Sequence, residues 1–374
     1  MKVQEIMKNQ GPWWAVGILV GGLLLMVHLR VLSYVTGQDP FTYTRLAIEL
    51  LDSRFSLECL GRVAKFVVPG YPILLAGVIK VAGPFAVSWV NVVLMIMAFG
   101  LLIRLLRHWG FSAGAALMIC WAAIWLVFRS GNLNAQYLFF AFRGAPQFLL
   151  VMGAYSLADG ALPVSRGGGG RLALATGLLL TGALIRETAL LAWPALAVRV
   201  AWGPEWRGAR IRGLAWLAGP LALALLAGLA AAWATGAGMN QQAGLWLRQL
   251  TQGGGSAYGV RLSQYLHLLH HEEWGWLGLG FGLLGLWHLR RRLHIALLWV
   301  LPALLGIAFY SGYKIHRRYL LDSLLLLSVV SSIGIWQALS LVRRGRNRLW
   351  DHGMLVAAAG LLLGLNLHMI QRLP

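Results

Sequence analysis

Long apolar runs alternate with short polar and basic segments along most of this chain. An α-helix needs roughly 20 consecutive apolar residues to cross the hydrocarbon layer of a membrane. Runs near or above that length cover 13–33, 84–104, 111–129, 136–157, 213–235, 274–289, 293–311, 319–341 and 352–370. The pattern predicts an all-α polytopic transmembrane bundle, in which residues 1–374 form a single integral membrane domain without a separate soluble domain.

Two shorter apolar runs, at 172–185 and 188–202, lie back to back around Arg186 and Glu187. A run of about 14 residues makes a helix of about 21 Å, which is shorter than the roughly 30 Å hydrocarbon core. We therefore expect a hairpin whose apex, with Arg186 and Glu187, lies below the membrane surface at the floor of a cavity. The alternative is one long tilted helix with both charges buried in the bundle.

The composition changes this picture only through its charge. Hydrophobic residues make up 59% of the chain and charged residues 12%, and the formal net charge is +20. Basic clusters occur at Arg104 with Arg107, Arg166 with Arg171, 199–212, Arg290–Arg292 and 343–348. Since basic residues concentrate in cytoplasmic loops, this excess predicts topology rather than nucleic-acid binding, with about eleven crossings. The long outer loops are then 34–83 and 236–273.

The first outer loop contains a two-faced helix and, at its start, an acidic residue. Thr42, Arg45, Glu49 and Asp52 recur on one side, and Tyr43, Leu46, Ala47 and Leu50 on the other. Such a helix lies flat at the membrane interface, with Arg45 and Glu49 spaced as an i,i+4 ion pair. Asp39 precedes Pro40, which is typical of a helix N-cap. A purely structural cap and a catalytic carboxylate both remain open for Asp39.

Several cations fall on the outer side, where the charge rule leaves few. They are Lys65, Arg186, Lys314, Arg317 and Arg318, with His316 in the same late segment. Arg binds phosphate with paired hydrogen bonds and Lys binds it as a point charge, so we expect a phosphate site; contact with anionic lipid headgroups is the alternative. Arg143 lies in a membrane run and either lines the same cavity or pairs with a buried carbonyl.

In their order along the chain, these features resemble the GT-C superfamily of polytopic membrane glycosyltransferases. The nearest likeness is to the bacterial branch that includes protein O-mannosyltransferases and the aminoarabinose transferase of lipid A. The resemblance is carried by Asp39 with Tyr43, Pro69–Pro72, the apex Gly182–Arg186 and the basic segment Lys314–Tyr319.

The resemblance implies a bacterial inner-membrane enzyme whose active site faces the periplasm. Such enzymes transfer a sugar from a polyprenyl-phosphate donor to a hydroxyl of a lipid, glycan or protein. The family's catalytic base, or metal ligand, maps onto Asp39. Carrier-phosphate binding maps onto Lys65, Lys314, Arg317 and Arg318, with Arg186 at the matching apex. The further pocket residues are Tyr43, Arg45, Glu58, Tyr71, Arg143, Glu187, His316 and Tyr319.

The chain also departs from the family pattern. Pro40 and Ala145 stand where acidic residues are usual, and no large C-terminal soluble domain follows. A divalent cation is therefore only an alternative, and no other cofactor is expected. With Glu58 and Glu187 as the only candidates for a second carboxylate, single displacement with inversion is favoured over double displacement. A transporter or flippase of a lipid-linked anion is the competing function, and a non-catalytic scaffold is a third.

Overall fold

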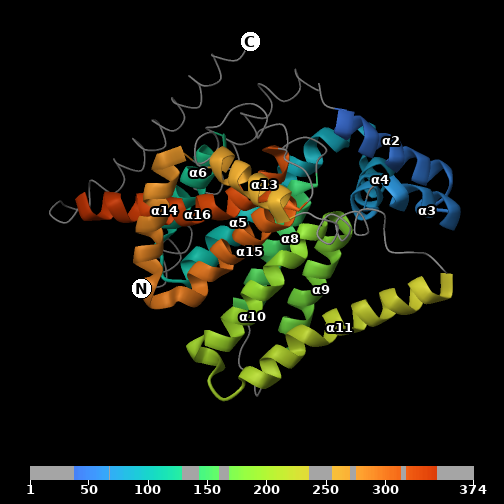
Figure 1. Cartoon of the computed structure of the whole chain (residues 1–374). Coiled ribbons are helices and arrows are strands. Elements are labelled where there is room, and N and C mark those ends of the chain that lie inside the picture. The colour runs from blue at the N-terminus through green and yellow to red at the C-terminus, as the bar shows by residue number, and fades with distance from the viewer. Residues whose placement is uncertain are drawn as a thin grey trace, which may run out of the picture.

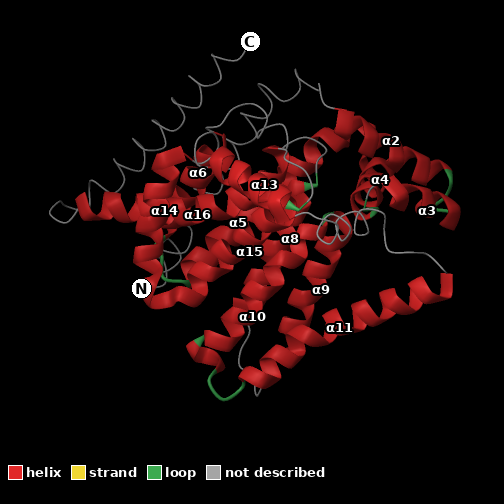
Figure 2. Ribbon diagram, in the orientation of Figure 1, coloured by secondary structure: helices red, strands yellow, loops and turns green. Residues whose placement is uncertain are grey.

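The structure is a computed structural model, and every regular element that it describes is a helix (Figures 1 and 2). It describes residues 38–66, 68–128, 143–159, 168–235, 255–269, 275–312 and 317–342. The apolar runs 13–33 and 352–370 lie outside this part of the chain, as do Lys314 and His316. Helical stretches long and apolar enough to cross a membrane are Trp89–His108, Arg210–Ala227, Gly275–Ser311 and Leu320–Leu341. The total of about eleven crossings stays a prediction.

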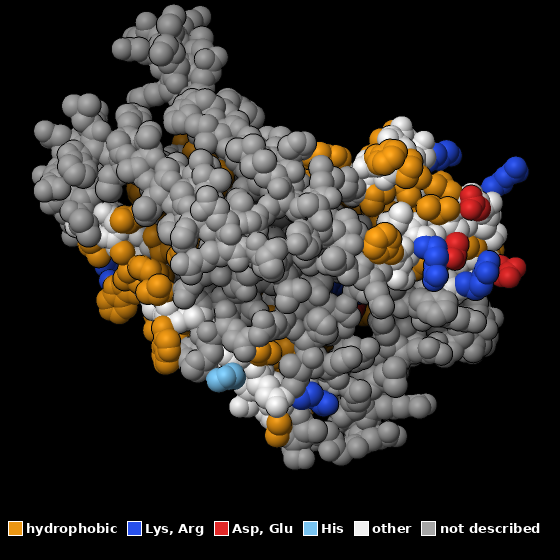
Figure 3. Space-filling model, turned by 90° about the horizontal axis from the view of Figure 1, so that it is seen from above, with side chains coloured by type: hydrophobic (Ala, Val, Ile, Leu, Met, Phe, Trp, Pro, Cys, Tyr) orange, Lys and Arg blue, Asp and Glu red, His pale blue; other side chains and the backbone are white. Residues whose placement is uncertain are grey.

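Helices are present in segment 34–83, as expected, and they form a small unit with its own core. They are α2 (Gln38–Asp52), α3 (Leu57–Phe66), α4 (Gly70–Ala82) and the short η1 (Pro84–Ala86). The predicted stripes of α2 are confirmed: Leu46 and Leu50 are buried, whereas Arg45 and Glu49 are exposed and paired at 3.5 Å. On the side where α2 and α3 lie, charged side chains of both signs stand beside exposed hydrophobic ones (Figure 3).

The main bundle follows the predicted apolar runs closely. It contains α5 (Val87–His108), α6 (Ala113–Phe128), α8 (Gly144–Asp159), α11 (Arg210–Thr235), α14 (Gly275–Leu289), α15 (Leu293–Ser311) and α16 (Arg317–Val342). Helix α16 packs against α6, α14 and α15, and 61% of its candidate span is buried, against 11% for the span in α11. Helix α11 extends away from the bundle (Figure 1). The core therefore forms around α16.

The two short apolar runs form a hairpin, as expected, and not one long helix. Helix α9 (Gly169–Ile185) ends where Arg186 adopts an extended conformation, and η3 (Glu187–Ala192) and α10 (Trp193–Trp202) then turn back. At the apex, a Cβ on Gly182 would lie 2.8 Å from the Cβ of Ala189. Glycine at this position therefore lets the returning arm approach α9 closely.

The basic segments near α5, α10 and α15 meet at one end of the bundle, called the Asp159 end below. Asp159 accepts hydrogen bonds from Arg199 at 2.8 Å and from the Trp109 indole at 2.8 Å, and His108 lies 3.4 Å away. Arg292 donates to the backbone carbonyl of Trp109 at 2.7 Å. These contacts bring three segments that the charge rule placed on one side of the membrane to the same end of the structure.

The opposite end, called the Arg186 end below, carries helices from both predicted outer loops. Gly70 at the start of α4 lies against the backbone carbonyl of Leu184, next to the hairpin apex. Helix α13 (Gly255–His267), the described part of the second outer loop, packs on the end of α15, where Arg261 donates to the Ser311 carbonyl at 2.8 Å. Parts of both predicted outer loops, 34–83 and 236–273, therefore lie at the Arg186 end.

Close helix crossing at glycines holds α14 against α16. A Cβ on Gly285 would collide with the carbonyl of Val330, and a Cβ on Gly334 with that of Phe281. Small residues allow helix backbones to approach closely in membrane bundles. The crossing therefore depends on glycine at both positions.

Replacement of Gly285 by Ala tests this crossing. Since the added methyl meets backbone rather than a movable side chain, we expect Gly285→Ala to destabilise the folded protein by about 1–3 kcal/mol. Gly280→Ala on the same helix is the matched control, because no atom lies within 4 Å of its added Cβ, and Ala is the better helix former. Thermal unfolding in detergent gives the comparison. Equal stability of the two variants would contradict the close crossing.

Candidate functional site

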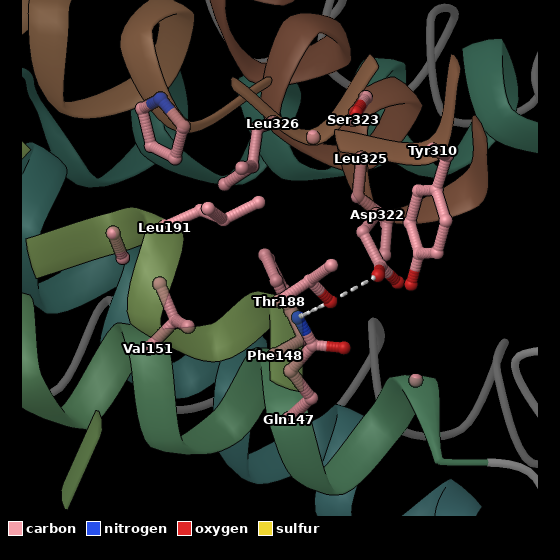
Figure 4. A pocket seen from close by; sticks show the side chains of 14 residues that line it. Gln147, Phe148, Val151, Thr188, Leu191, Tyr310, Asp322, Ser323, Leu325 and Leu326 are labelled. Atoms are coloured by element: carbon pink, nitrogen blue, oxygen red, sulfur yellow. Dashed lines mark hydrogen bonds between the residues drawn. The ribbon is translucent and has the colours of Figure 1, made fainter. Parts of the chain in front are cut away.

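A buried network of charged and polar side chains surrounds Arg186 at the hairpin apex. The Arg186 Nη1 atom lies 2.9 Å from Asp322 Oδ1, and its Nε donates to the Tyr310 hydroxyl at 3.1 Å. Thr188 donates to the other carboxylate oxygen of Asp322 at 3.0 Å, and Gln147 Nε2 donates to Thr188 at 2.9 Å. Figure 4 shows the chain from Gln147 through Thr188 to Asp322.

Each member of this network comes from the end of a different element. Gln147 lies in the first turn of α8, Tyr310 in the last turn of α15 and Asp322 in the second turn of α16. Arg186 occupies the break between α9 and η3, where the chain leaves the helical conformation. The helix ends and the hairpin apex therefore converge, so that residues distant in sequence share one buried site.

The charge on Arg186 is compensated inside the protein. Only 7% of the residue is exposed, and it lies at a turn outside the four candidate spans. Burial disfavours the charged guanidinium, but Asp322 and Tyr310 more than offset this and raise the pKa of Arg186 above its ordinary value. Removing one partner of such a buried pair leaves an uncompensated charge, which is strongly destabilising.

A second ion pair connects this network to the α2–α4 unit. Arg143, just before α8, lies with Nη1 3.9 Å from Glu187 Oε2. Its guanidinium also lies over the ring of Tyr43 in α2, 5.6 Å from the ring centroid. Tyr43 packs edge-to-face on Tyr71 at 5.4 Å, and Tyr71 donates to Asn91 at 3.1 Å. Arg143 therefore bridges the α2–α4 unit and the hairpin apex.

A cavity lies beside the network and has one polar and one apolar side. Gln147, Thr188, Tyr310 and Asp322 form its polar side (Figure 4). The apolar side includes Phe148, Val151, Leu191, Leu325 and Leu326. About 30 Å³ of the cavity is open to the centre of a water-sized sphere, so the cavity is smaller than typical small-molecule sites.

The structure places the predicted site residues in three groups. Arg186, Glu187 and Arg143 meet at the hairpin apex. Tyr43 and Tyr71 are buried in the core of the α2–α4 unit. Arg45 and Glu58 are exposed on α2 and α3, so they do not line the cavity.

For other predicted residues only the backbone is described. Asp39 lies in the first turn of α2, four residues before Tyr43. Arg317, Arg318 and Tyr319 open α16, three to five residues before Asp322. Lys65 lies near the end of α3. Since one helical turn takes 3.6 residues, the starts of α2 and α16 lie about one turn from residues of the apex network.

The sequence interpretation missed Asp322, Thr188, Gln147 and Tyr310. It named Glu58 and Glu187 as the only candidates for a second carboxylate, whereas a further carboxylate, that of Asp322, lines the cavity. The available signal was the single Asp within the apolar run 319–341. An ionisable residue in a membrane segment is by default a functional candidate with a buried partner, and the apex residue Arg186 is that partner.

No group of three or more His, Cys, Asp or Glu side chains that could hold a metal ion occurs in the described part of the chain. No protein-family model, curated protein or solved structure matches the chain. The chemistry of the Arg186 end therefore has to be inferred from its own residues.

Removal of the Asp322 charge tests whether the pair holds the apex in place. Asp322→Asn leaves Arg186 charged and buried, so we expect a loss of about 3–5 kcal/mol in the free energy of unfolding. In the double variant Arg186→Met, Asp322→Leu neither charge remains, and most of the stability should return. Thermal unfolding in detergent measures both. If the double variant is no more stable than Asp322→Asn, the two charges are not coupled.

Proposed function

We propose that this protein is a membrane glycosyltransferase of the GT-C type, which moves a sugar from a polyprenyl-phosphate donor to a hydroxyl acceptor. One observation supports this most strongly: the start of α2 with Asp39 and the start of α16 with Arg317 and Arg318 flank the same end of the bundle as the Arg186–Asp322 network. A carboxylate and a group of cations near one cavity are what transfer from a lipid phosphate requires.

In this proposal Asp39 is the catalytic base. It accepts the proton of the acceptor hydroxyl as the hydroxyl oxygen bonds to the anomeric carbon of the sugar. The bond between that carbon and the phosphate oxygen breaks, and its electron pair leaves with the polyprenyl phosphate. One displacement of this kind inverts the configuration at the anomeric carbon.

Cations at the start of α16 stabilise the leaving phosphate. Arg186 is already compensated by Asp322, so we assign it to positioning the apex rather than to the phosphate. Lys314, Arg317 and Arg318 remain for the phosphate, together with Lys65 near the end of α3. Fixed cations at a developing anion lower the barrier without a metal.

We further propose that the Arg186 end faces the periplasm of a bacterial inner membrane. The basic segments that gather at the Asp159 end are then cytoplasmic. The amphipathic helices α2 and α3 lie at the outer interface, with exposed Phe41 and Leu57 available to the lipid. A lipid donor can thus reach the cavity from the membrane while an acceptor arrives from the water.

Replacement of Asp39 separates catalysis from binding. Asp39→Asn keeps the size of the side chain but cannot accept a proton, so we expect sugar transfer to fall by roughly 10²-fold or more while binding of the lipid donor persists. Asp52→Asn, at the exposed far end of the same helix, should keep wild-type transfer. Transfer is measured with a radiolabelled sugar on undecaprenyl phosphate. A wild-type rate of sugar transfer in Asp39→Asn removes Asp39 from the mechanism. If the protein moves the lipid-linked sugar across vesicle membranes but transfers no sugar, the competing transporter function is supported.

Removal of two cations from α16 tests the phosphate assignment. Arg317→Gln with Arg318→Gln should weaken the binding of undecaprenyl phosphate by roughly tenfold or more, because charge-assisted hydrogen bonds to phosphate are lost. Arg290→Gln with Arg291→Gln removes the same charge from the opposite end and is the control. Binding is followed by tryptophan fluorescence in detergent. Similar weakening in both double variants would point to a nonspecific effect of net charge.

A further inference from the structure

Three buried polar atoms at the hairpin apex and around the start of α8 have no hydrogen-bond partner within the described residues. They are Nη1 of Arg143, Oε1 of Gln147 and Oε2 of Glu187. Arg143 and Gln147 lie one helical turn apart at the start of α8, and Glu187 precedes Thr188, which accepts the hydrogen bond of Gln147. Buried polar atoms without partners are uncommon and costly, so three at one place indicate a ligand that supplies the missing partners.

The spacing of two of these atoms limits what the ligand can be. Arg143 Nη1 and Glu187 Oε2 are 3.9 Å apart, which is too long for a hydrogen bond but leaves room for one oxygen about 2.8 Å from each. That oxygen must accept from the guanidinium and donate to the carboxylate. A hydroxyl does both, whereas an ionised phosphate oxygen cannot donate and is repelled by Glu187.

The orientation of Gln147 adds a second acceptor to the same set. The Asp322 carboxylate can only accept, so the Thr188 hydroxyl must donate to it and in turn accepts from the Gln147 amide nitrogen. This chain fixes the amide and leaves Gln147 Oε1 to accept a hydrogen bond from elsewhere. Gln147 contacts Thr188, the neighbour of Glu187, so two acceptors and one donor are available for neighbouring hydroxyls on one molecule.

We propose that Arg143, Gln147 and Glu187 form a subsite that binds hydroxyls of the sugar carried by the lipid donor. The proposal rests on the function proposed above and adds to it the place of the sugar. Tyr43 joins this subsite to α2 through its contact with Arg143, and Asp39 lies one turn earlier on that helix. Asp322 and Thr188 act through Gln147 and are positioning residues.

Four lipids that differ only in the presence or kind of sugar provide the test. The probes are undecaprenyl phosphate and undecaprenyl phosphate bearing one mannose, with a glucose-bearing and an arabinose-bearing lipid in parallel, and dissociation constants are measured with the full chain in detergent. Wild type should bind at least one sugar-bearing lipid more tightly than the bare lipid. Glu187→Gln and Gln147→Met should each weaken that binding roughly five- to tenfold and change binding of the bare lipid less than twofold.

Matched controls and a second readout keep the outcomes distinct. Glu49→Gln and Gln264→Met make the same chemical changes at exposed positions and should change neither affinity. If Gln147→Met fails to fold in thermal unfolding, the isosteric Glu187→Gln decides. Equal affinities of wild type for all four lipids, or equal weakening of the bare and sugar-bearing lipids by the variants, would overturn the subsite and indicate that water fills it.

The transfer assay separates the two proposals. If wild type transfers sugar but the variants show no sugar-specific loss, only the subsite is overturned. If wild type neither binds these lipids nor transfers sugar, the proposed function falls and the subsite falls with it.

Discussion

The ion pair between Arg186 and Asp322 is the interaction on which the site depends. Its partners lie 136 positions apart in the sequence, and both are shielded from water by an apolar bundle. A charge buried in such surroundings is costly unless it is paired and hydrogen-bonded, so the fold must bring the hairpin apex and α16 together whenever both charges are present. Tyr310, Thr188 and Gln147 then complete the hydrogen bonding, which fixes α15 and α8 at the same point.

The bundle contains a second buried pair, between Arg199 and Asp159. At the Asp159 end, the Trp109 indole donates a hydrogen bond to the Asp159 carboxylate, and Arg292 donates one to the backbone carbonyl of Trp109. At the Arg186 end, a cavity is lined by Gln147, Thr188, Tyr310 and Asp322, and the predicted site residues Arg143 and Glu187 pair next to the apex. The proposed chemistry is assigned to the Arg186 end because the cavity and the predicted site residues Arg143, Arg186 and Glu187 lie there.

The sequence predicted those parts of the fold that depend on local periodicity. The apolar runs became α5, α6, α14, α15 and α16 with small shifts of their ends, and the stripes of α2 were correct because burial follows the helical repeat. The hairpin was predictable because its arms are too short to span the membrane.

Asp322 was missed because its role depends on a partner brought close only by the tertiary fold, and a lone Asp in an apolar run does not reveal that partner. Arg45 and Glu58 were predicted to line the pocket because they lie near Asp39 in the sequence. In the structure, Arg45 on α2 and Glu58 on α3 are exposed.

The central claim is that Asp39 and the cations of α16 lie at one end of the bundle, opposite the basic segments of the Asp159 end. Labelling of single cysteines on intact cells with a membrane-impermeant maleimide tests it most directly, in a background where the buried Cys59 and Cys120 are replaced by Ala. We expect Asp39→Cys and Arg318→Cys to react from outside, and Arg107→Cys and Arg291→Cys to react only after the membrane is opened. Reaction of positions 39 and 318 from opposite sides would contradict the account.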